Sequence, residues 1–538
     1  MSRRSAWLLA AALAGASCIG NSPIPKDGDP PSDEAQVCTT EVGARLLRRL
    51  TAWEMERTLR DIFTLSEEEW GGTRLGADPL SKHGFTNDAD LLLVGSQSAE
   101  DILATAEELA QLVVQSDKLT TLLPCAGTAL DDACVEQFVA IYGRRLYRRP
   151  LSAEERLEYQ TLYTKIRDQA DANTGLKWLL VALIQSPQAV YRAELGVMAG
   201  EHYDLSQHEL ATEIAYTFSG TTPSAALLDK ADQGKLDSEE AVIAEARALS
   251  ATPRGRETVH RLLQEWSGYA TIHGKAKDVV DNFDVISELM AEETHRFLDD
   301  VVIEKEGGVA ELLTAPHTFV DGTLANFYGF SVTGSAFQQI DRPANWGVGL
   351  LAQGSLLGAY AHMGSSSPTL RGLFVLRRLL CQETEAPDNV ALPPLPAQAP
   401  GETTTRERYE SVHTASAQCS YCHDRFDPMG FALEHFDETG RYRETEHGLT
   451  IDDSGHVSFA GADPTPIQGP VQFAETLAAS EQTSACISDL FARYTYGSAP
   501  CMNGPMADAR RGLSERDYGL TEYLIQLATT PHFYRRMP

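Results

Sequence analysis

The sequence predicts a mainly α-helical protein made of multi-helical modules, with one small β-hairpin region near residues 449–470. Apolar residues recur at helical spacing in many separate segments. Several of these segments begin at a Ser that can cap a helix, followed by Glu three positions later or by Pro at the first helical position. Short strand-like runs separated by Asp and Gly occur only near 449–470, so this is the one β element we expect.

The helices follow from the same periodicity, taken in chain order. Ser152 with Glu155, Ser206, and Ser367 with Pro368 are the clearest helix starts. The expected helices span residues 45–65, 99–115, 133–149, 176–185, 207–218, 224–236, 253–269, 286–302, 369–381, 473–479, 485–496 and 519–528. A Pro-rich strap at 386–401 should be extended.

Two features of these helices have a structural and a functional interpretation. Arginines gather at the end of the 133–149 helix, at positions 144, 145, 148 and 149. They are either cations at the negative end of a helix dipole or a clamp for an anion. His295, on the 286–302 helix, is expected to be an exposed or hydrogen-bonded residue rather than a metal ligand.

The N-terminus has the pattern of an export signal. Arg3 and Arg4 precede an apolar run that is too short to span a bilayer. Residues 15–18, Gly-Ala-Ser-Cys, are similar to a bacterial lipoprotein box, so Cys18 is either lipidated or lost by plain cleavage. We therefore expect an exported protein, in the periplasm or at the cell surface, with membrane attachment through a lipid anchor at Cys18 as one option.

Charge and cysteine content agree with that location. The chain has 45 basic and 76 acidic residues, a net charge of -31, which disfavours a nucleic-acid partner because phosphate would be repelled. Six cysteines outside the terminal and C-x-x-C positions are an even number for an oxidising compartment. The expected disulfides are Cys125–Cys134, then Cys486–Cys501, then Cys38–Cys381.

The strongest chemical signal is C-x-x-C-H, formed by Cys419, Cys422 and His423. In c-type cytochromes the two cysteines bind haem covalently and the histidine ligates the iron. A zinc site would need a second ligand pair, and the chain has no other C-x-x-C and no H-x-x-x-H. We predict covalent haem c, with a different metal site or a redox dithiol as the remaining alternatives.

The ligand on the opposite face of the iron decides the chemistry, because a strong sixth ligand favours electron transfer and an open position admits small molecules. His413 has the freedom to reach that position because a loop separates it from the cysteines. His362 or Met363 would reach it if their loop packs on the haem. Met429 is only six residues beyond His423, which is a short path around a haem edge. An open site is the last alternative.

Several phrases together resemble one family, the modular secreted proteins of planctomycetes and myxobacteria built from consecutive domains of unknown function with a c-type cytochrome motif (PSD/PSCyt type). These phrases are residues 49–62, 147–152, 186–192, 318–320, 366–372, and 419–423 with 427–434. The resemblance implies an extracytoplasmic, mainly helical protein with one haem motif, whose relatives are thought to act in redox or polysaccharide-related surface processes. It also implies a histidine at position 413 and usually Ile or Leu at position 429.

The chain is too long for one domain. The expected divisions are a signal peptide (1–18), a flexible tether (19–37), an N-terminal helical domain (38–120), a helical domain with the Arg-rich helix end (121–195), a helical domain (196–335), a domain with the cytochrome-c-like haem segment and the Pro-rich strap (336–447), and a C-terminal helical domain (448–538).

Two functions from different classes follow. The first is an extracytoplasmic haem protein in electron transfer, or the haem module of an oxidoreductase, with a redox partner protein. The alternative is a surface-anchored structural or binding protein in which haem is structural or absent. Whether the chain is itself an enzyme stays open, and no Ser-His-Asp, P-loop or dinucleotide-binding motif suggests another enzyme class.

Overall fold

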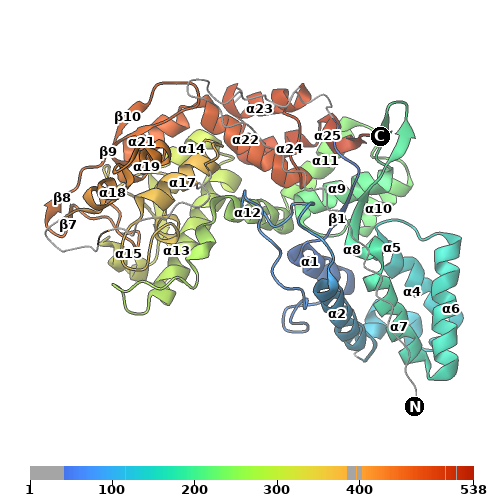
Figure 1. Cartoon of the computed structure of the whole chain (residues 1–538). Helices are drawn as coiled ribbons and strands as arrows, with labels where there is room; N and C mark the ends of the chain where they lie inside the picture. Colours follow the sequence, from blue (N-terminus) through green and yellow to red (C-terminus); the bar gives the residue numbers. More distant parts are fainter. Residues whose placement is uncertain (1–41, 116, 385–395, 397–402, 503, 516–517) are drawn as a thin grey trace, which may run out of the picture. The chain divides into compact units, whose positions relative to one another are not determined.

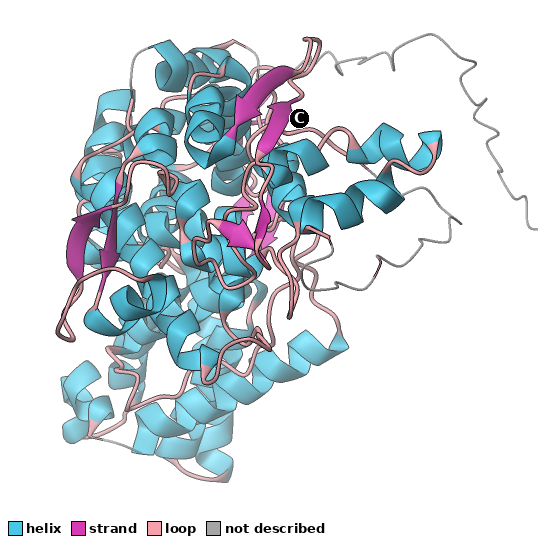
Figure 2. Ribbon diagram, turned by 90° about the vertical axis from the view of Figure 1, so that its left-hand side faces the viewer, coloured by secondary structure: helices cyan, strands magenta, loops and turns pink. Residues whose placement is uncertain are grey.

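Helices make up most of the described chain, and the strands are few and short (Figures 1 and 2). The computed structural model describes residues 42–538 with gaps at 116, 385–395, 397–402, 503 and 516–517. The expected signal peptide, tether, Cys18 and Cys38, and most of the Pro-rich strap lie outside the described residues. The mainly helical fold class is confirmed, while the predicted domain boundaries stay predictions.

The N-terminal part is organised on helix α1 (Ala52–Phe63). Thr51 begins it with a capping box, in which its side chain accepts from the Glu54 amide and Glu54 bonds the Thr51 amide. The residues before Thr51 form strand β1 (Leu46–Arg49), which pairs antiparallel with β2 (Tyr191–Glu194). The prediction of one helix over 45–65 was therefore wrong at its start, because pairing with a distant strand outweighs local periodicity.

The helices that follow α1 share a hydrophobic core with it, and α7 packs against both α2 and α6 (Figure 1). They are α2 (Ser96–Gln115), α3 (Lys118–Leu122), α4 (Asp132–Phe138), α5 (Arg144–Tyr147), α6 (Ala153–Gln169), α7 (Ala172–Gln185) and α8 (Pro187–Val190). Short 3₁₀ and π segments, η1 (Pro124–Gly127) and η2 (Val139–Gly143), lie among them. The predicted disulfide Cys125–Cys134 is confirmed.

A second and larger hydrophobic core is built from the middle and C-terminal helices. The middle elements are α9 (Gln207–Ser219), α10 (Ala225–Asp232), α11 (Glu239–Ser250), α12 (Pro253–Ser267), η3 (Tyr269–Ile272), α13 (Phe283–Leu298), the π-helix η4 (Asp299–Glu304), α14 (Val309–Thr314), α15 (Gly322–Tyr328), η5 (Leu350–Ala352), α16 (Gly354–Ala359) and α17 (Pro368–Arg378). The C-terminal elements are α18 (Thr405–His413), α19 (Ala417–His423), α20 (Asp427–Phe431), α21 (Gly469–Ala478), α22 (Glu481–Tyr496), α23 (Pro505–Glu515), α24 (Leu520–Leu527) and α25 (Pro531–Tyr534).

The described strands form small antiparallel sheets of two or three strands. The hairpin predicted near 449–470 is present as β9 (Ser454–Val457) and β10 (Thr465–Gln468). The expectation that it would be the one β element was wrong. The further strands are β3 (Val197–Ala199), β4 (His202–Asp204), β5 (His317–Val320), β6 (Gln338–Asp341), β7 (Thr445–Glu446), β8 (Leu449–Thr450) and β11 (Arg535–Arg536).

A buried ion network joins distant parts of the chain. Arg48 of β1 lies 3.2 Å from Glu194 of β2 and 3.6 Å from Glu213 of α9. Arg192 pairs with Glu213 at 2.8 Å, and Arg536 of β11 pairs with Glu194 at 2.6 Å. Buried charges of this kind are tolerated only when each is paired. The network therefore holds β1, β2, α9 and β11 in one arrangement.

The second described disulfide differs from the prediction. Cys381, just after α17, is bonded to Cys486 of α22, and their Cα atoms are 5.2 Å apart. The predicted pairs Cys486–Cys501 and Cys38–Cys381 were therefore wrong. Cys501 is itself disulfide-bonded. The packing of α17 against α22, rather than proximity in the sequence, brings Cys381 and Cys486 together.

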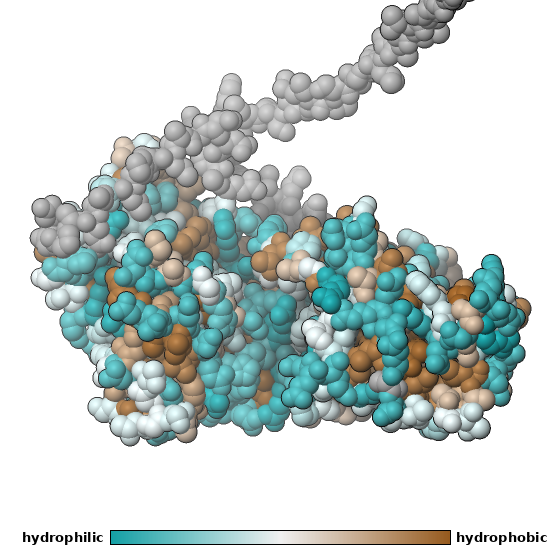
Figure 3. Space-filling model, turned by 90° about the horizontal axis from the view of Figure 1, so that it is seen from below, coloured by the Kyte–Doolittle hydropathy of each residue, from teal (hydrophilic) through white to brown (hydrophobic). Residues whose placement is uncertain are grey.

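On the face that Figure 3 shows, hydrophilic residues cover much of the described surface and hydrophobic residues gather in separate areas. Within residues 42–538, the gaps excepted, no helix combines the length and the apolar character needed to cross a bilayer.

Candidate functional site

The C-x-x-C-H motif lies on α19, between α18 and α20. Ser416 starts α19, because its side chain accepts a hydrogen bond from the Cys419 amide. Cys419 and Cys422 are three residues apart on this helix, so their side chains project from the same face. His423 follows at the end of the helix.

Both motif cysteines are free thiols, and both are half-buried. The Sγ atom of Cys419 accepts a hydrogen bond from Ser416 Oγ at 3.1 Å, and Cys422 packs against the larger hydrophobic core. Tyr421, between them, is 73% exposed. The other cysteines in the described part of the chain are all in disulfides, so these two thiols are the ones that remain for covalent attachment.

His413 and His423 stack face to face and share one carboxylate oxygen. Their ring centroids are 3.5 Å apart, with 30° between the ring planes. The Nδ1 atoms of His413 and His423 lie 2.5 Å and 3.0 Å from Oδ2 of Asp427. Both imidazoles are therefore on the same side of this carboxylate, and three possible metal ligands lie together.

Asp427 is buried, and its second oxygen accepts from Thr369 Oγ1 at 2.6 Å. Burial raises the pKa of this carboxyl, but the hydrogen bonds from His413, His423 and Thr369 outweigh burial and hold its pKa below the ordinary value. A carboxylate that accepts from Nδ1–H of a neutral imidazole leaves the ring's lone pair on Nε2. His423 is thus prepared to bind a metal through Nε2.

Two glycines allow α17 and α20 to support the site. A Cβ atom at Gly430 would lie 2.0 Å from the Pro368 carbonyl oxygen, and one at Gly372 would lie 1.9 Å from the Phe426 carbonyl oxygen. Any side chain at either position would push the two helices apart. This close approach brings Thr369 of α17 to Asp427 of α20.

Asp427 and Glu434, the acidic residues of the segment 427–434, make different contacts. Glu434 is buried and accepts from Ser366 Oγ at 2.7 Å and from Arg443 at 3.2 Å. Burial raises the pKa of Glu434. Asp427 instead faces the histidines, so the two carboxylates belong to separate hydrogen-bond groups. Arg371, also buried, donates to backbone carbonyls, including that of Phe436 at 2.8 Å.

A cavity of ≈ 350 Å³ borders His413, His423 and Asp427. Its lining also includes Arg406, which pairs with Glu410 at 2.9 Å and lies with its Cζ atom 4.7 Å from the ring centre of Phe431. The remaining lining residues are Thr414, Asp424, Pro428, Ser454, Gly455 and His456. The two histidines thus face a space with cationic, acidic and aromatic side chains around it.

The other residues singled out from the sequence lie elsewhere. Met429 is fully buried in the larger core and does not line this cavity, whereas His362 and Met363 are exposed. The four clustered arginines all bind groups of the protein itself. Arg144 pairs with Asp229 and Asp232, and Arg149 pairs with Glu155. Arg145 donates to the carbonyls of Asp61 and Ile62, and Arg148 donates to those of Gln188, Ala189 and Tyr191. These partners favour a structural role over an anion clamp.

Sequence reasoning missed a second group of possible metal ligands, His260, His295 and Asp299. His295 and Asp299 are four residues apart across the end of α13, a spacing that the sequence does show. His260 comes from α12, and only the packing of α12 on α13 reveals it. His295 is 43% exposed and hydrogen-bonded within this cluster, as expected, while the expectation that it is not a metal ligand stays a prediction.

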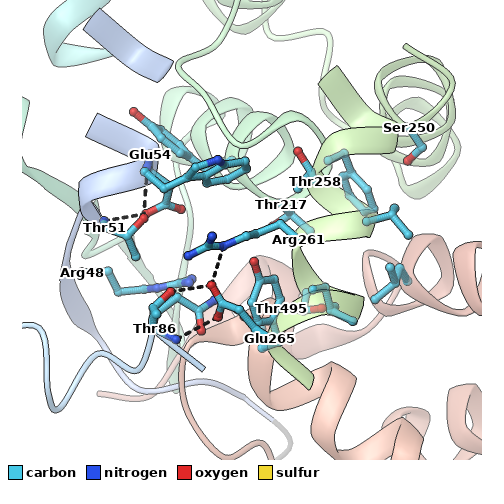
Figure 4. Close-up of a pocket in the computed structure, with 18 of the residues that line it drawn as sticks. Arg48, Thr51, Glu54, Thr86, Thr217, Ser250, Thr258, Arg261, Glu265 and Thr495 are labelled. Atoms are coloured by element: carbon cyan, nitrogen blue, oxygen red, sulfur yellow. Dashed lines mark hydrogen bonds and ion pairs between the residues drawn. The ribbon is translucent and has the colours of Figure 1, made fainter. Parts of the chain in front are cut away.

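A further cavity lies beside the buried ion network, and Figure 4 shows its lining. Glu265 accepts from Arg261 at 2.6 Å and from the Thr86 hydroxyl at 2.7 Å, while Thr51 and Glu54 bond each other across the start of α1. The cavity volume is ≈ 30 Å³. That volume holds roughly two water molecules, so this cavity suits internal hydration rather than a substrate.

Comparisons with known proteins match four family models in consecutive order. They are PSD3 (protein of unknown function, DUF1587) at residues 48–115, PSD5 (DUF1595) at 134–194, PSD4 (DUF1592) at 205–330 and PSCyt3 (DUF1588) at 348–446. The PSCyt3 match contains the C-x-x-C-H motif and both histidines of the stacked pair. No curated protein and no solved structure matches the chain.

Proposed function

Because this chain belongs to the family of proteins built from consecutive PSD3, PSD5, PSD4 and PSCyt3 domains, we propose that it is an extracytoplasmic c-type haem protein that transfers electrons. One observation carries the proposal: two free thiols on one helical face precede an imidazole whose Nδ1 is bonded to a buried carboxylate.

The donor set of this chain fits a covalently bound haem. Cys419 and Cys422 would form thioethers with the vinyl groups, and His423 would ligate the iron through Nε2. Haem bound in this way supplies reversible one-electron chemistry at iron. Asp427 orients the His423 ring, selects its tautomer and makes its free nitrogen a stronger ligand.

The cavity beside the stacked histidines gives further support. Its volume of ≈ 350 Å³ leaves room next to His423, and Arg406 in its lining is a cation with which a propionate carboxylate can pair. Phe431 contributes an aromatic surface.

His413 was expected as a possible sixth ligand, and its contacts in the structure support a different role. His413 stacks on His423 and bonds the same oxygen of Asp427, so both imidazoles lie on one side of this carboxylate. To act as a second iron ligand, His413 would have to give up its stacking on His423. We therefore propose that His413 is a positioning residue that holds Asp427 in place, with the sixth-ligand role as the alternative.

The proposed location and partners follow from sequence and disulfides together. Two described disulfides suit an oxidising compartment, in agreement with the expected export signal. The partner would be another redox protein, and the net charge of -31 argues against nucleic acid. Attachment through a lipid at Cys18 stays part of the proposal.

The test uses full-length protein matured in a host with haem-attachment machinery. Wild-type protein should keep haem stain after denaturing gel electrophoresis and show a reversible reduced-minus-oxidised spectrum of the c type. Cys422→Ala should lose covalent haem, while the control Ser420→Ala, between the two cysteines, should keep it. Haem stain retained in Cys422→Ala would refute the assignment. A wild-type protein that folds fully without haem would instead favour a surface-anchored structural or binding protein.

A further inference from the structure

A second histidine cluster lies outside the haem segment, in the region matched by the PSD4 model. His260 comes from α12, Tyr269 from η3, His295 from α13, and Asp299 from the start of the π-helix η4. π-Helical turns occur often at functional sites because they shift side chains out of the regular helical register.

Each imidazole has one edge that faces Asp299 and a second edge that faces the other histidine. On one edge, Nδ1 of His260 lies 3.1 Å from Oδ1 of Asp299, and Nε2 of His295 lies 3.3 Å from Oδ2 of the same carboxylate. On the other edge, Nε2 of His260 and Nδ1 of His295 are 2.5 Å apart. The Tyr269 hydroxyl lies 2.7 Å from that same Nε2 of His260.

Counting the N–H groups shows which ring nitrogens between the two histidines carry lone pairs. A carboxylate only accepts, so both ring nitrogens that face Asp299 carry hydrogen when they bond it. Each neutral imidazole has one N–H, which leaves lone pairs on Nε2 of His260 and Nδ1 of His295. Two lone pairs that face each other repel, and either a proton or a metal cation between them removes the repulsion. Imidazole nitrogens with N–H bonded to a carboxylate are the usual ligands of Zn²⁺ and related ions.

The space between the two histidines is buried on one side and exposed to water on the other. His260 and Tyr269 are buried, whereas the side chains of His295 and Asp299 are 43% and 42% exposed. Water can therefore reach a bound ion and complete its coordination. Glu292 on α13 adds a further negative charge near the cluster, although it is paired with Arg296 at 2.7 Å.

We propose that Nε2 of His260 and Nδ1 of His295 bind one divalent transition-metal ion of the Zn²⁺ class, with the Tyr269 oxygen as the third protein atom at the site and Asp299 as the carboxylate that positions both rings. The two nitrogens move apart by roughly 0.5–1 Å to reach the spacing of two ligands around such an ion. This site is independent of the haem segment, and its assignment does not depend on the proposed electron transfer.

The test measures zinc and cobalt bound to full-length, haem-matured protein. After equilibrium dialysis and elemental analysis, wild type should hold one equivalent of either ion, and bound Co²⁺ should show the absorption of a nitrogen-ligated site. His295→Ala should lose that equivalent, and its half-exposed position lets the fold be kept, which circular dichroism checks. Asp299→Asn should weaken binding by about ten- to a hundredfold.

Two controls separate this site from other histidines. His202→Ala removes an imidazole that also faces one carboxylate, Asp204 at 3.1 Å, but that contacts no second histidine among the described residues, and this variant should keep the ion. His423→Ala removes the stacked histidine of the haem segment and should also keep it. Unchanged binding in His295→Ala would overturn the proposal. Failure of wild type to bind either ion would overturn it too, and would leave a proton shared between the two nitrogens as the explanation of their contact.

Discussion

Arg536 donates two hydrogen bonds to the same carboxylate oxygen of Glu194, at 2.6 Å from Nη2 and 3.0 Å from Nε, although 342 positions separate the two residues. Both side chains are 3% exposed. Glu194 also lies 3.2 Å from Arg48, so one buried carboxylate joins the first described strand to β11.

Removing Arg536 should therefore destabilise the whole protein. Arg536→Ala leaves Glu194 short of a buried partner, which costs about 3–5 kcal/mol of unfolding free energy. The neighbouring Arg535→Ala is a matched control, because Arg535 pairs with Asp204 at the surface and such pairs contribute at most about 1 kcal/mol. Urea unfolding followed by circular dichroism measures both. Equal losses in the two variants would contradict a dominant role for the buried network.

His532, beside this network, should make the protein sensitive to mild acid. Burial, with Arg536 and Arg48 nearby, lowers the pKa of His532 from 6.5 to about 3. The unfolded chain therefore binds a proton at this residue before the folded protein does, so stability is lost as the pH falls below about 6.5 and continues to be lost down to about 3.

The expected size of this effect is about 2 kcal/mol between about pH 7 and pH 5. Above about pH 5 the effect of Glu194 is small, because its carboxyl titrates near 4.5 in the unfolded chain and its pKa falls to about 2 in the folded protein, where the neighbouring arginines outweigh burial. His532→Gln should flatten the dependence of unfolding free energy on pH in that interval. An unchanged slope would show that His532 does not titrate as proposed.

The two described disulfides should differ in their contributions to stability. In the chain-entropy account, Cys125–Cys134 closes a separation of 9 residues and contributes about 3 kcal/mol, whereas Cys381–Cys486 closes 105 residues and contributes about 5 kcal/mol. Paired Cys→Ser variants, compared by denaturant unfolding, measure this difference. The longer loop contains the C-x-x-C-H segment, so its removal also reports whether that segment unfolds separately. A larger loss from the shorter loop would contradict the entropic account.

Asp427 and His413 give a test of the haem ligands. Asp427→Asn should raise the midpoint potential of the proposed haem, because it removes a negative charge and weakens the hydrogen bond to His423, the proposed ligand. His413→Ala should leave the spin state of the iron unchanged if His413 only positions Asp427. Visible absorption and electron paramagnetic resonance measure the midpoint potential of Asp427→Asn and the spin state of His413→Ala. A change from low to high spin in His413→Ala would identify His413 as the sixth ligand and reject the positioning role.

Local features of the fold were predictable from sequence where the interactions are themselves local. Ser152 with Glu155 forms the predicted capping box of α6, and Ser206 and Ser367 begin α9 and α17. The C-x-x-C-H motif was visible for the same reason, because its three residues lie within about one helical turn. These contacts span three or four residues, so neighbours along the chain decide them.

Long-range features were not predictable in this way. The apolar spacing of β1 fits both a helix and a strand, so the sequence predicts a helix there, and only the pairing with β2 makes it a strand. The bond between Cys381 and Cys486 depends on how α17 meets α22. Around the C-x-x-C-H motif, the sequence placed His413 six residues before Cys419 but could not show that it stacks on His423.

By itself, the sequence determined the helical class, the starts of many helices and the paired thiols with their adjacent histidine, because each depends on residues within one or two turns of one another. Only the tertiary structure decided that Asp427 is shared by two imidazoles, that His260 meets His295, and that Glu194 is paired with Arg536. These contacts join separate elements, and their energies depend on burial and on the packing of helices and strands far apart in the chain.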